Sequence, residues 1–223
     1  MDLSPVEARV IGSLAEKQLT TPQQYPLTMN ALVLACNQTS NRDPVVNYDE
    51  ETVESALSSL REDGLLRLVH PSHGRSATRY RQVLDERFGL DARSLAVLAV
   101  LLLRGPQTTG ELRTRTERMA DFASLEEVEH ELVRLAGGDE PFLVRLPRRP
   151  GQKEERWGET LSVARPEARD AAPAANGPEQ ARRPPVSEEL GSLRATVDAL
   201  QMEVSRIAAA VEELRTELGL SPD

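Results

Sequence analysis

The feature of this sequence that most constrains its fold is an internal repeat. The stretches 52–60 and 127–135 share one amphipathic helical pattern, at a constant offset of 75 residues. The matching apolar positions are Val53, Leu57 and Leu60 in the first copy and Val128, Leu132 and Leu135 in the second. Because the offset is far longer than one helix, each copy is expected to be part of a larger folding unit that occurs twice.

Each copy of the repeated helix is followed by the pattern of a β-hairpin. In the first copy, apolar strand-like segments occupy 65–69 and 77–83, with a turn between them. In the second copy, the corresponding segments are 142–146 and 155–159. A helix that leads directly into a hairpin with basic residues along its edges is typical of the end of a winged-helix domain.

Two further helices are predicted before the hairpin of the first copy. Ser4 and Glu7 form a capping box with proline at the first helical position, and a second helix is expected over Leu27–Cys36. The third helix begins near Asp49 and ends at Gly64, since glycine is favoured just after a helix end. The predicted order is helix, helix, helix, hairpin.

The second copy repeats this order with shorter connections. A helix is predicted over 91–104, a second one capped by Thr108 and Glu111, and a third one capped by Ser124 and Glu127. The predicted fold is therefore mainly α with small β-hairpins. It consists of two tandem winged-helix domains, residues 1–85 and 86–165.

The rest of the chain has a different composition. Residues 166–186 are rich in proline and alanine and predict a linker, whereas residues 187–220 carry apolar residues at alternating spacings of three and four. This spacing predicts a coiled-coil helix that forms a parallel homodimer; a helix that folds back on the repeats is the alternative. The dimerisation positions are Leu190, Leu193, Val197, Leu200, Val204, Ile207, Val211, Leu214 and Leu218.

The charge of the chain is unevenly distributed. The net charge is −9, but residues 1–85 contribute −3, residues 86–165 contribute −1 and residues 166–223 contribute −5. Cys36 is the only cysteine, and the sequence shows neither a signal segment nor an apolar run longer than Leu95–Leu103. We therefore expect a cytoplasmic protein without a membrane partner.

The two predicted winged-helix domains carry opposite charges on their third helices and hairpins. The third helix of the first domain holds six acidic residues and one basic residue, Arg61. The third helix of the second domain holds four acidic residues and one basic residue, Arg134, so both helices would repel a DNA duplex. The hairpins are basic, and arginine binds phosphate or carboxylate well. The predicted nucleic-acid-binding residues are Arg67, Arg75, Arg79, Arg81, Arg145, Arg148, Arg149 and Lys153, although these charges could also serve only to solvate the turns.

No motif for catalysis is present in the sequence. His70 and His73 lack further metal ligands nearby, and Cys36 lies in an apolar helical pattern typical of a buried structural cysteine. Phosphate-binding glycine loops and hydrolase motifs are absent. We therefore expect no enzyme activity, cofactor or metal.

Several segments resemble the YceH family of uncharacterised bacterial proteins. The most specific is Met29–Val46, supported by 7–17, 21–27 and 115–122. The resemblance covers roughly residues 3–161, implies a tandem winged-helix fold and supplies no activity. Among the motif residues, the side chains of Asn37, Asn41 and Asp43 are expected to satisfy backbone groups in an irregular turn, and Arg42 is expected to pair with Asp43 or with a nearby helix end. A ligand site is the alternative.

The sequence therefore predicts a non-enzymatic, dimeric regulator that contacts double-stranded DNA through its basic hairpins. The alternative is a scaffold whose acidic third helices bind a basic protein partner without DNA. The sequence names neither a DNA target, a protein partner nor a pathway.

Overall fold

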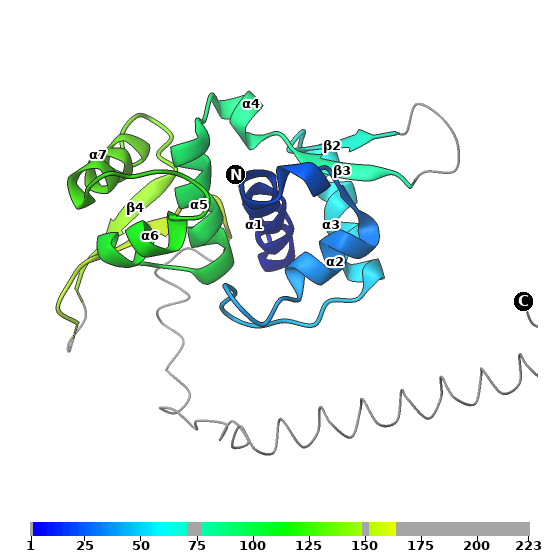
Figure 1. The fold of residues 1–223 in the computed structure, drawn as a ribbon, viewed down its shortest axis with the longest axis horizontal. Coiled ribbons are helices and arrows are strands. Elements are labelled where there is room, and N and C mark those ends of the chain that lie inside the picture. The colour runs from blue at the N-terminus through cyan, green and yellow to red at the C-terminus, as the bar shows by residue number, and fades with distance from the viewer. Residues whose placement is uncertain (1, 71–76, 149–151, 164–223) are drawn as a thin grey trace, which may run out of the picture. The chain divides into compact units, whose positions relative to one another are not determined.

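The computed structural model describes residues 2–70, 77–148 and 152–163. The chain divides between residues 172 and 173, and every described residue belongs to the first part. The described part is mainly helical with small antiparallel strand pairs, as the sequence predicts (Figure 1). The predicted linker and coiled coil lie outside the described residues.

The first half contains three α-helices and a three-stranded sheet. Ser4 and Glu7 form the predicted capping box, in which the Ser4 amide donates to the Glu7 carboxylate at 2.6 Å. The elements in chain order are α1 (Pro5–Thr20), the 3₁₀ turn η1 (Pro22–Gln24), β1 (Leu27–Thr28), α2 (Met29–Cys36), α3 (Glu50–Glu62), β2 (Leu66–Val69) and β3 (Arg79–Gln82).

Strand β1 is the one element of this half that the sequence analysis assigned to a helix. The strands are ordered β1-β3-β2, both pairs are antiparallel, and Leu27 lies opposite Tyr80. Thr28 is the N-cap of α2, and its hydroxyl accepts a hydrogen bond from the Ala31 amide at 3.4 Å. Because an N-cap residue has an extended backbone, Thr28 can pair with β3 and still start the helix.

The second half repeats the order of the first. The short helix α4 (Leu84–Phe88), which was not predicted, connects to α5 (Ala92–Arg104), α6 (Thr109–Thr116), α7 (Leu125–Leu135), β4 (Leu143–Leu146) and β5 (Arg156–Glu159). Thr108 and Glu111 form a capping box, and the Ser124 hydroxyl accepts from the Glu127 amide, as predicted. Gln107 forms a single antiparallel bridge to Trp157 in β5, so it takes the place that β1 has in the first half.

The repeated apolar positions of α3 and α7 are all buried, which confirms the helical faces predicted from the 75-residue offset. These positions are Val53, Leu57, Leu60, Val128, Leu132 and Leu135. Each helix therefore packs the same face on its own half of the core.

The two halves share one hydrophobic core, because α1 and α5 pack against each other along their length (Figure 1). Gly12 allows this close approach: a Cβ atom there would lie 3.0 Å from Leu102 Cβ and 3.0 Å from Leu103 Cγ. Leu3 also reaches the second half, where its amide donates to the Leu161 carbonyl at 2.8 Å. The N-terminal segment thus forms part of the packing of both halves.

Candidate interaction surfaces

The loop between α2 and α3 contains the motif residues, and several of them hold the loop in place. The Asn37 side chain donates to the Tyr48 carbonyl and accepts from the Tyr48 amide, both at 2.8 Å. Asn41 has a positive φ of 58°, which asparagine tolerates better than most residues. Its Oδ1 atom accepts from Arg104 Nη1 at 3.0 Å, so the loop is tied to α5.

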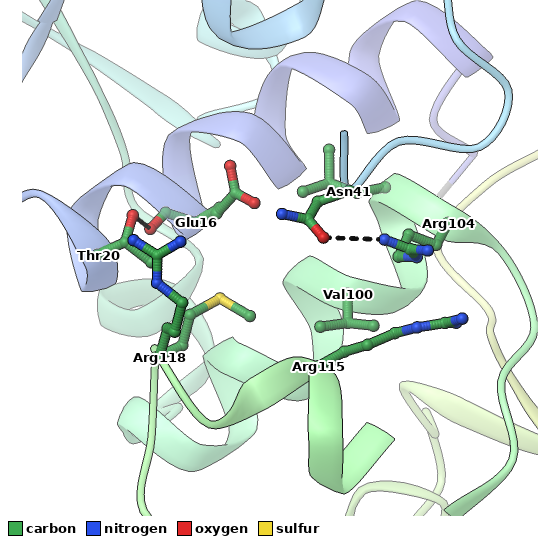
Figure 2. A pocket seen from close by; sticks show the side chains of 9 residues that line it. Glu16, Thr20, Asn41, Val100, Arg104, Arg115 and Arg118 are labelled. Carbon is green, nitrogen blue, oxygen red and sulfur yellow. Dashed lines mark hydrogen bonds between the residues drawn. The ribbon is translucent and has the colours of Figure 1, made fainter. Parts of the chain in front are cut away.

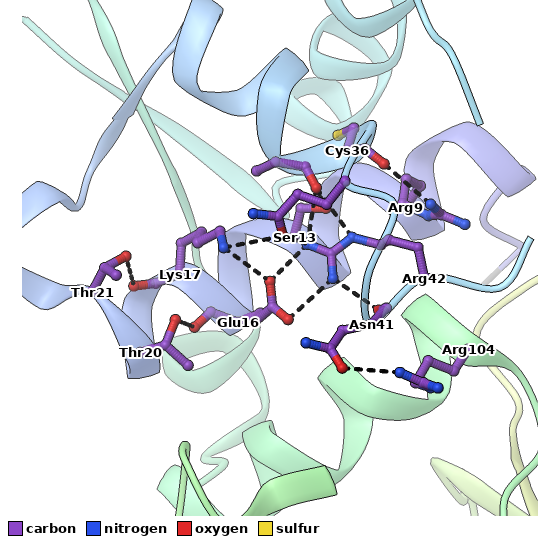
Figure 3. Close-up of polar contacts among 12 residues, drawn as sticks. Arg9, Ser13, Glu16, Lys17, Thr20, Thr21, Cys36, Asn41, Arg42 and Arg104 are labelled. Carbon is purple, nitrogen blue, oxygen red and sulfur yellow. Dashed lines mark hydrogen bonds and ion pairs between the residues drawn. The ribbon is translucent and has the colours of Figure 1, made fainter. Parts of the chain in front are cut away.

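Arg42 is the buried centre of this loop (Figure 3). Its side chain is 0% exposed and forms a two-point ion pair with Glu16 of α1, with N–O distances of 3.0 and 2.6 Å. It also donates to the Ala35 carbonyl near the end of α2 and to Gln38 Oε1. Of the two partners expected for Arg42, the helix end is present, at the Ala35 carbonyl. The carboxylate that pairs with Arg42 belongs to Glu16 and not to Asp43.

Burial opposes ionisation of Glu16, but the hydrogen bonds and charge of Arg42, helped by Lys17, outweigh burial and lower the pKa of Glu16. Glu16 is therefore ionised at neutral pH. The buried pair joins α1, α2 and the motif loop, which gives these residues a structural role.

The described arginines of the first hairpin are bound to other parts of the protein. Arg67 Nη1 lies 2.5 Å from Glu86 Oε2, and Arg81 contacts the other oxygen of the same carboxylate. Arg79 Nη1 donates to the Pro26 carbonyl at 2.7 Å. The fourth predicted residue, Arg75, lies outside the described residues. These three arginines are thus partly neutralised or engaged before any partner binds.

In the second hairpin, only some of the predicted basic residues are bound to other parts of the protein. Arg145 pairs with Glu129 at 2.8 Å and with Glu155 at 3.1 Å, and its guanidinium lies 5.1 Å from the centre of the Trp157 ring. Arg148 and Lys153 are exposed beside it. Arg149 lies outside the part of the chain that the structure describes.

Each half has a groove between its third helix and its hairpin. The first groove, lined by Glu54, Leu57, Leu66, Leu68 and Tyr80 among others, has an empty volume of about 600 Å³, part of it open to solvent. The second groove, lined by Thr109, Glu129, Arg145, Arg148, Lys153 and Trp157 among others, measures about 850 Å³ on the same basis. The repeat has therefore produced two surfaces of one kind.

The two grooves differ in the ion pairing of one equivalent carboxylate. The 75-residue offset relates Glu54 to Glu129, and both line their groove. Glu129 is paired with Arg145, whereas Glu54 forms no ion pair with any residue in the described ranges. Burial, followed by the charges of Glu54 and Glu50, raises the pKa of the Tyr80 hydroxyl in the first groove.

A further hollow lies where the two halves meet, lined by residues of α1, the motif loop, α5 and α6 (Figure 2). It contains about 390 Å³ of empty space, part of it open to solvent. Its lining includes Glu16, Asn41, Arg104, Arg115 and Arg118, and Arg104 and Arg115 also line an adjoining hollow with Arg156. Arg104, Arg115 and Arg118 were not among the site residues predicted from the sequence, although Arg115 and Arg118 lie in a segment that carries the family resemblance.

The described residues offer little to catalysis by cysteine or to metal binding. Cys36 is fully buried, and burial raises the pKa of its thiol, which disfavours the reactive thiolate. Within the described ranges, no three His, Cys, Asp or Glu side chains form a group that could hold a metal ion. None of the described helices is long and apolar enough to cross a membrane.

The predicted dimerisation positions lie outside the described residues, namely Leu190, Leu193, Val197, Leu200, Val204, Ile207, Val211, Leu214 and Leu218.

Comparison with known proteins gives bacterial relatives along most of the chain. A family model described as a protein of unknown function, DUF480, matches residues 3–152. A UPF0502 protein of Solibacter usitatus is 46% identical over 213 residues, which are 96% of each chain. Another, of Geobacter metallireducens, is 47% identical over 95% of this chain and 88% of its own. A third, of Enterobacter sp. strain 638, is 43% identical over 97% and 98%. Matches of this length extend beyond residue 165 into the C-terminal tail.

Proposed function

Because the chain belongs to the DUF480 family of proteins of unknown function, its relatives supply no activity, and we propose that it is a non-enzymatic protein-interaction module whose first groove binds a basic segment of a partner. The membership agrees with the family resemblance predicted from the motif residues. We further propose that the module consists of two tandem winged-helix domains.

The order of elements supports the winged-helix proposal. The first half has a helix, a short strand, two helices and a hairpin, and its short strand pairs with the second strand of the hairpin. The second half has the same order, with the single bridge from Gln107 to Trp157 in place of the short strand. A winged-helix domain has this arrangement, and its third helix and hairpin present the surface most often used for binding.

The observation that carries the functional proposal is the contrast between Glu54 and Glu129. In the second groove, Arg145 neutralises the carboxylate of Glu129. In the first groove, the equivalent carboxylate of Glu54 has no such cation among the described residues, and neither has Glu50 one turn earlier. Two exposed carboxylates beside a groove of mixed polarity favour a partner that brings its own positive charge.

The shape and polarity of the first groove specify the kind of partner. Leu68 and Tyr80 are half-buried and give the groove accessible apolar surface beside the two carboxylates, whereas Leu57 and Leu66 are buried in its wall. Arg61 lines the groove nearer the C-terminal end of α3, so the acidic part is restricted to the first turns of this helix. A basic amphipathic segment would place its apolar side chains on Leu68 and Tyr80 and its Lys or Arg side chains at Glu50 and Glu54.

DNA contact through the second hairpin is the second candidate function. It is favoured by Arg148 and Lys153, which are exposed at the second groove. Three observations weigh against it: Glu129, Glu154 and Glu155 line the same groove, Arg145 is already paired, and α3 would repel phosphates. For this reason we place protein binding first.

The proposal is tested by fluorescence anisotropy with a labelled, lysine-rich amphipathic peptide and a random-sequence DNA duplex at low salt. We expect the peptide to bind and the combined variant Glu50→Lys with Glu54→Lys to bind it roughly tenfold more weakly, because attraction is replaced by repulsion. The matched control, Asp139→Lys with Glu140→Lys, makes the same charge change at exposed positions outside the groove. Equal weakening by both variants, or binding of the duplex but not the peptide, contradicts the proposal.

The heptads of the tail extend the proposal to assembly. A parallel coiled coil would place two first grooves in one molecule, joined through the proline-rich segment 166–186. A partner with two basic segments would then bind with higher avidity than a single groove provides.

A further inference from the structure

The hollow beside the motif loop gathers arginines from separate parts of the second half. Arg104 lies at the end of α5, Arg115 on α6 and Arg156 at the start of β5. They line one hollow of about 620 Å³, part of it open to solvent, together with Asp43 of the motif loop. Residues from both halves of the protein therefore form its walls.

The positive charge in this hollow is only partly compensated. Three guanidinium groups face two carboxylates, those of Asp43 and Glu111. Glu111 is shared between Arg115 at 3.5 Å and Arg156 at 3.4 Å, and it also accepts from the Thr108 amide in the capping box. Burial lowers the pKa of Arg115, and so do the charges of Arg104 and Arg156. The arginines thus lie close enough to repel one another, in a protein whose net charge is −9.

We propose that this hollow binds a phosphate group, held by Arg104, Arg115 and Arg156. Arginine forks bind phosphate oxygens at two points, and a dianion would remove the repulsion among the three guanidinium groups.

The position of the hollow gives the ligand a structural consequence. Asp43 and Asn41 belong to the motif loop of the first half, and Asn41 is bonded to Arg104. A phosphate held by the three arginines would strengthen a contact between the halves. Binding should therefore raise the melting temperature of the protein, because a ligand that binds only the folded state stabilises it.

The test is isothermal titration calorimetry of the full chain with inorganic phosphate, adenosine monophosphate and adenosine, at constant ionic strength. Arg115→Gln and Arg156→Gln each remove one guanidinium, and both are checked for folding by circular dichroism. Arg113→Gln is the matched control, since Arg113 is on the same helix as Arg115, is exposed and lies outside the hollow. If either test variant fails to fold, the other one decides the outcome.

We expect saturable phosphate binding that is at least tenfold weaker in both test variants and unchanged in the control, since a hydrogen bond to a charged group contributes about that factor. Binding of the nucleotide in preference to free phosphate, with none to adenosine, also supports the site and identifies a nucleotide as the source. Absence of saturable binding, or equal loss in the control, overturns the proposal.

Discussion

Replacing Arg42 by alanine should greatly lower the free energy of unfolding of this protein. The change leaves Glu16 in place with a side chain that is only 10% exposed, and it removes a partner that is 0% exposed. Removing one member of a buried ion pair typically costs about 3–5 kcal/mol, because the remaining charge is desolvated without compensation. Because both side chains are almost fully buried, solvent screening reduces this energetic cost only slightly. We therefore expect the free energy of unfolding, measured by urea denaturation, to fall by about this amount.

A matched double variant separates the charge from the packing. Glu16→Leu with Arg42→Met replaces both charges by apolar groups of similar size, and such replacements are often neutral. We therefore expect the double variant to be clearly more stable than Arg42→Ala. The reasoning is refuted if Arg42→Ala costs less than about 1 kcal/mol, the size expected of an exposed pair.

The pH dependence provides an independent check on the same pair. The pKa of Glu16 is lowered from its ordinary value of 4.5, so its contribution is fully present above that pH and is lost as the pH falls through the lowered pKa. Without Arg42, only Lys17, whose Nζ lies 3.3 Å from the Glu16 carboxylate, opposes the effect of burial, so the pKa of Glu16 should rise above its wild-type value and the carboxyl should become protonated more easily. The stability difference between wild type and Arg42→Ala should therefore shrink as the solution is acidified towards the ordinary pKa of Glu16.

Three further predictions concern the domains, the tail and the second hairpin. A fragment of residues 1–165 should unfold cooperatively by circular dichroism, whereas residues 1–85 alone would expose the face of α1 that packs on α5 and should be largely unfolded. Ile207→Asp places a charge in the predicted coiled-coil seam and should convert a dimer into monomers by light scattering; a wild-type protein that is already monomeric contradicts the heptad reading. Replacing Arg148 and Arg149 by alanine should leave peptide binding unchanged. A loss of duplex binding, with a salt slope smaller by about one to two, would instead support the DNA alternative.

The features that the sequence predicted well are local ones. The capping boxes of α1 and α6 depend on residues three positions apart, and both are present. The buried faces of α3 and α7 follow from helical spacing alone. Strand β1 was missed because two residues carry no periodic pattern, and its pairing depends on β3, which is about 50 positions away.

The candidate sites depend on contacts that no local pattern reveals. Arg42 could be expected to bond a helix end, but its pairing with Glu16 joins positions 26 residues apart. The contact of Arg104 with Asn41 spans 63 positions, and the arginine hollow combines α5, α6 and β5. The basic hairpins were evident from the sequence, whereas the carboxylates that neutralise Arg67 and Arg145 depend on the folded geometry.

The most direct test of the proposed function is hydrogen–deuterium exchange of the full chain with the basic peptide and, separately, with the DNA duplex. We predict that the peptide slows exchange in α3, β2 and β3 around the first groove, and that the duplex changes exchange little anywhere. Because protection reports where a partner binds, it distinguishes a site at Glu54 from a diffuse attraction to an acidic protein. Protection confined to β4, β5 and the turn between them, produced by the duplex and not by the peptide, would contradict the account.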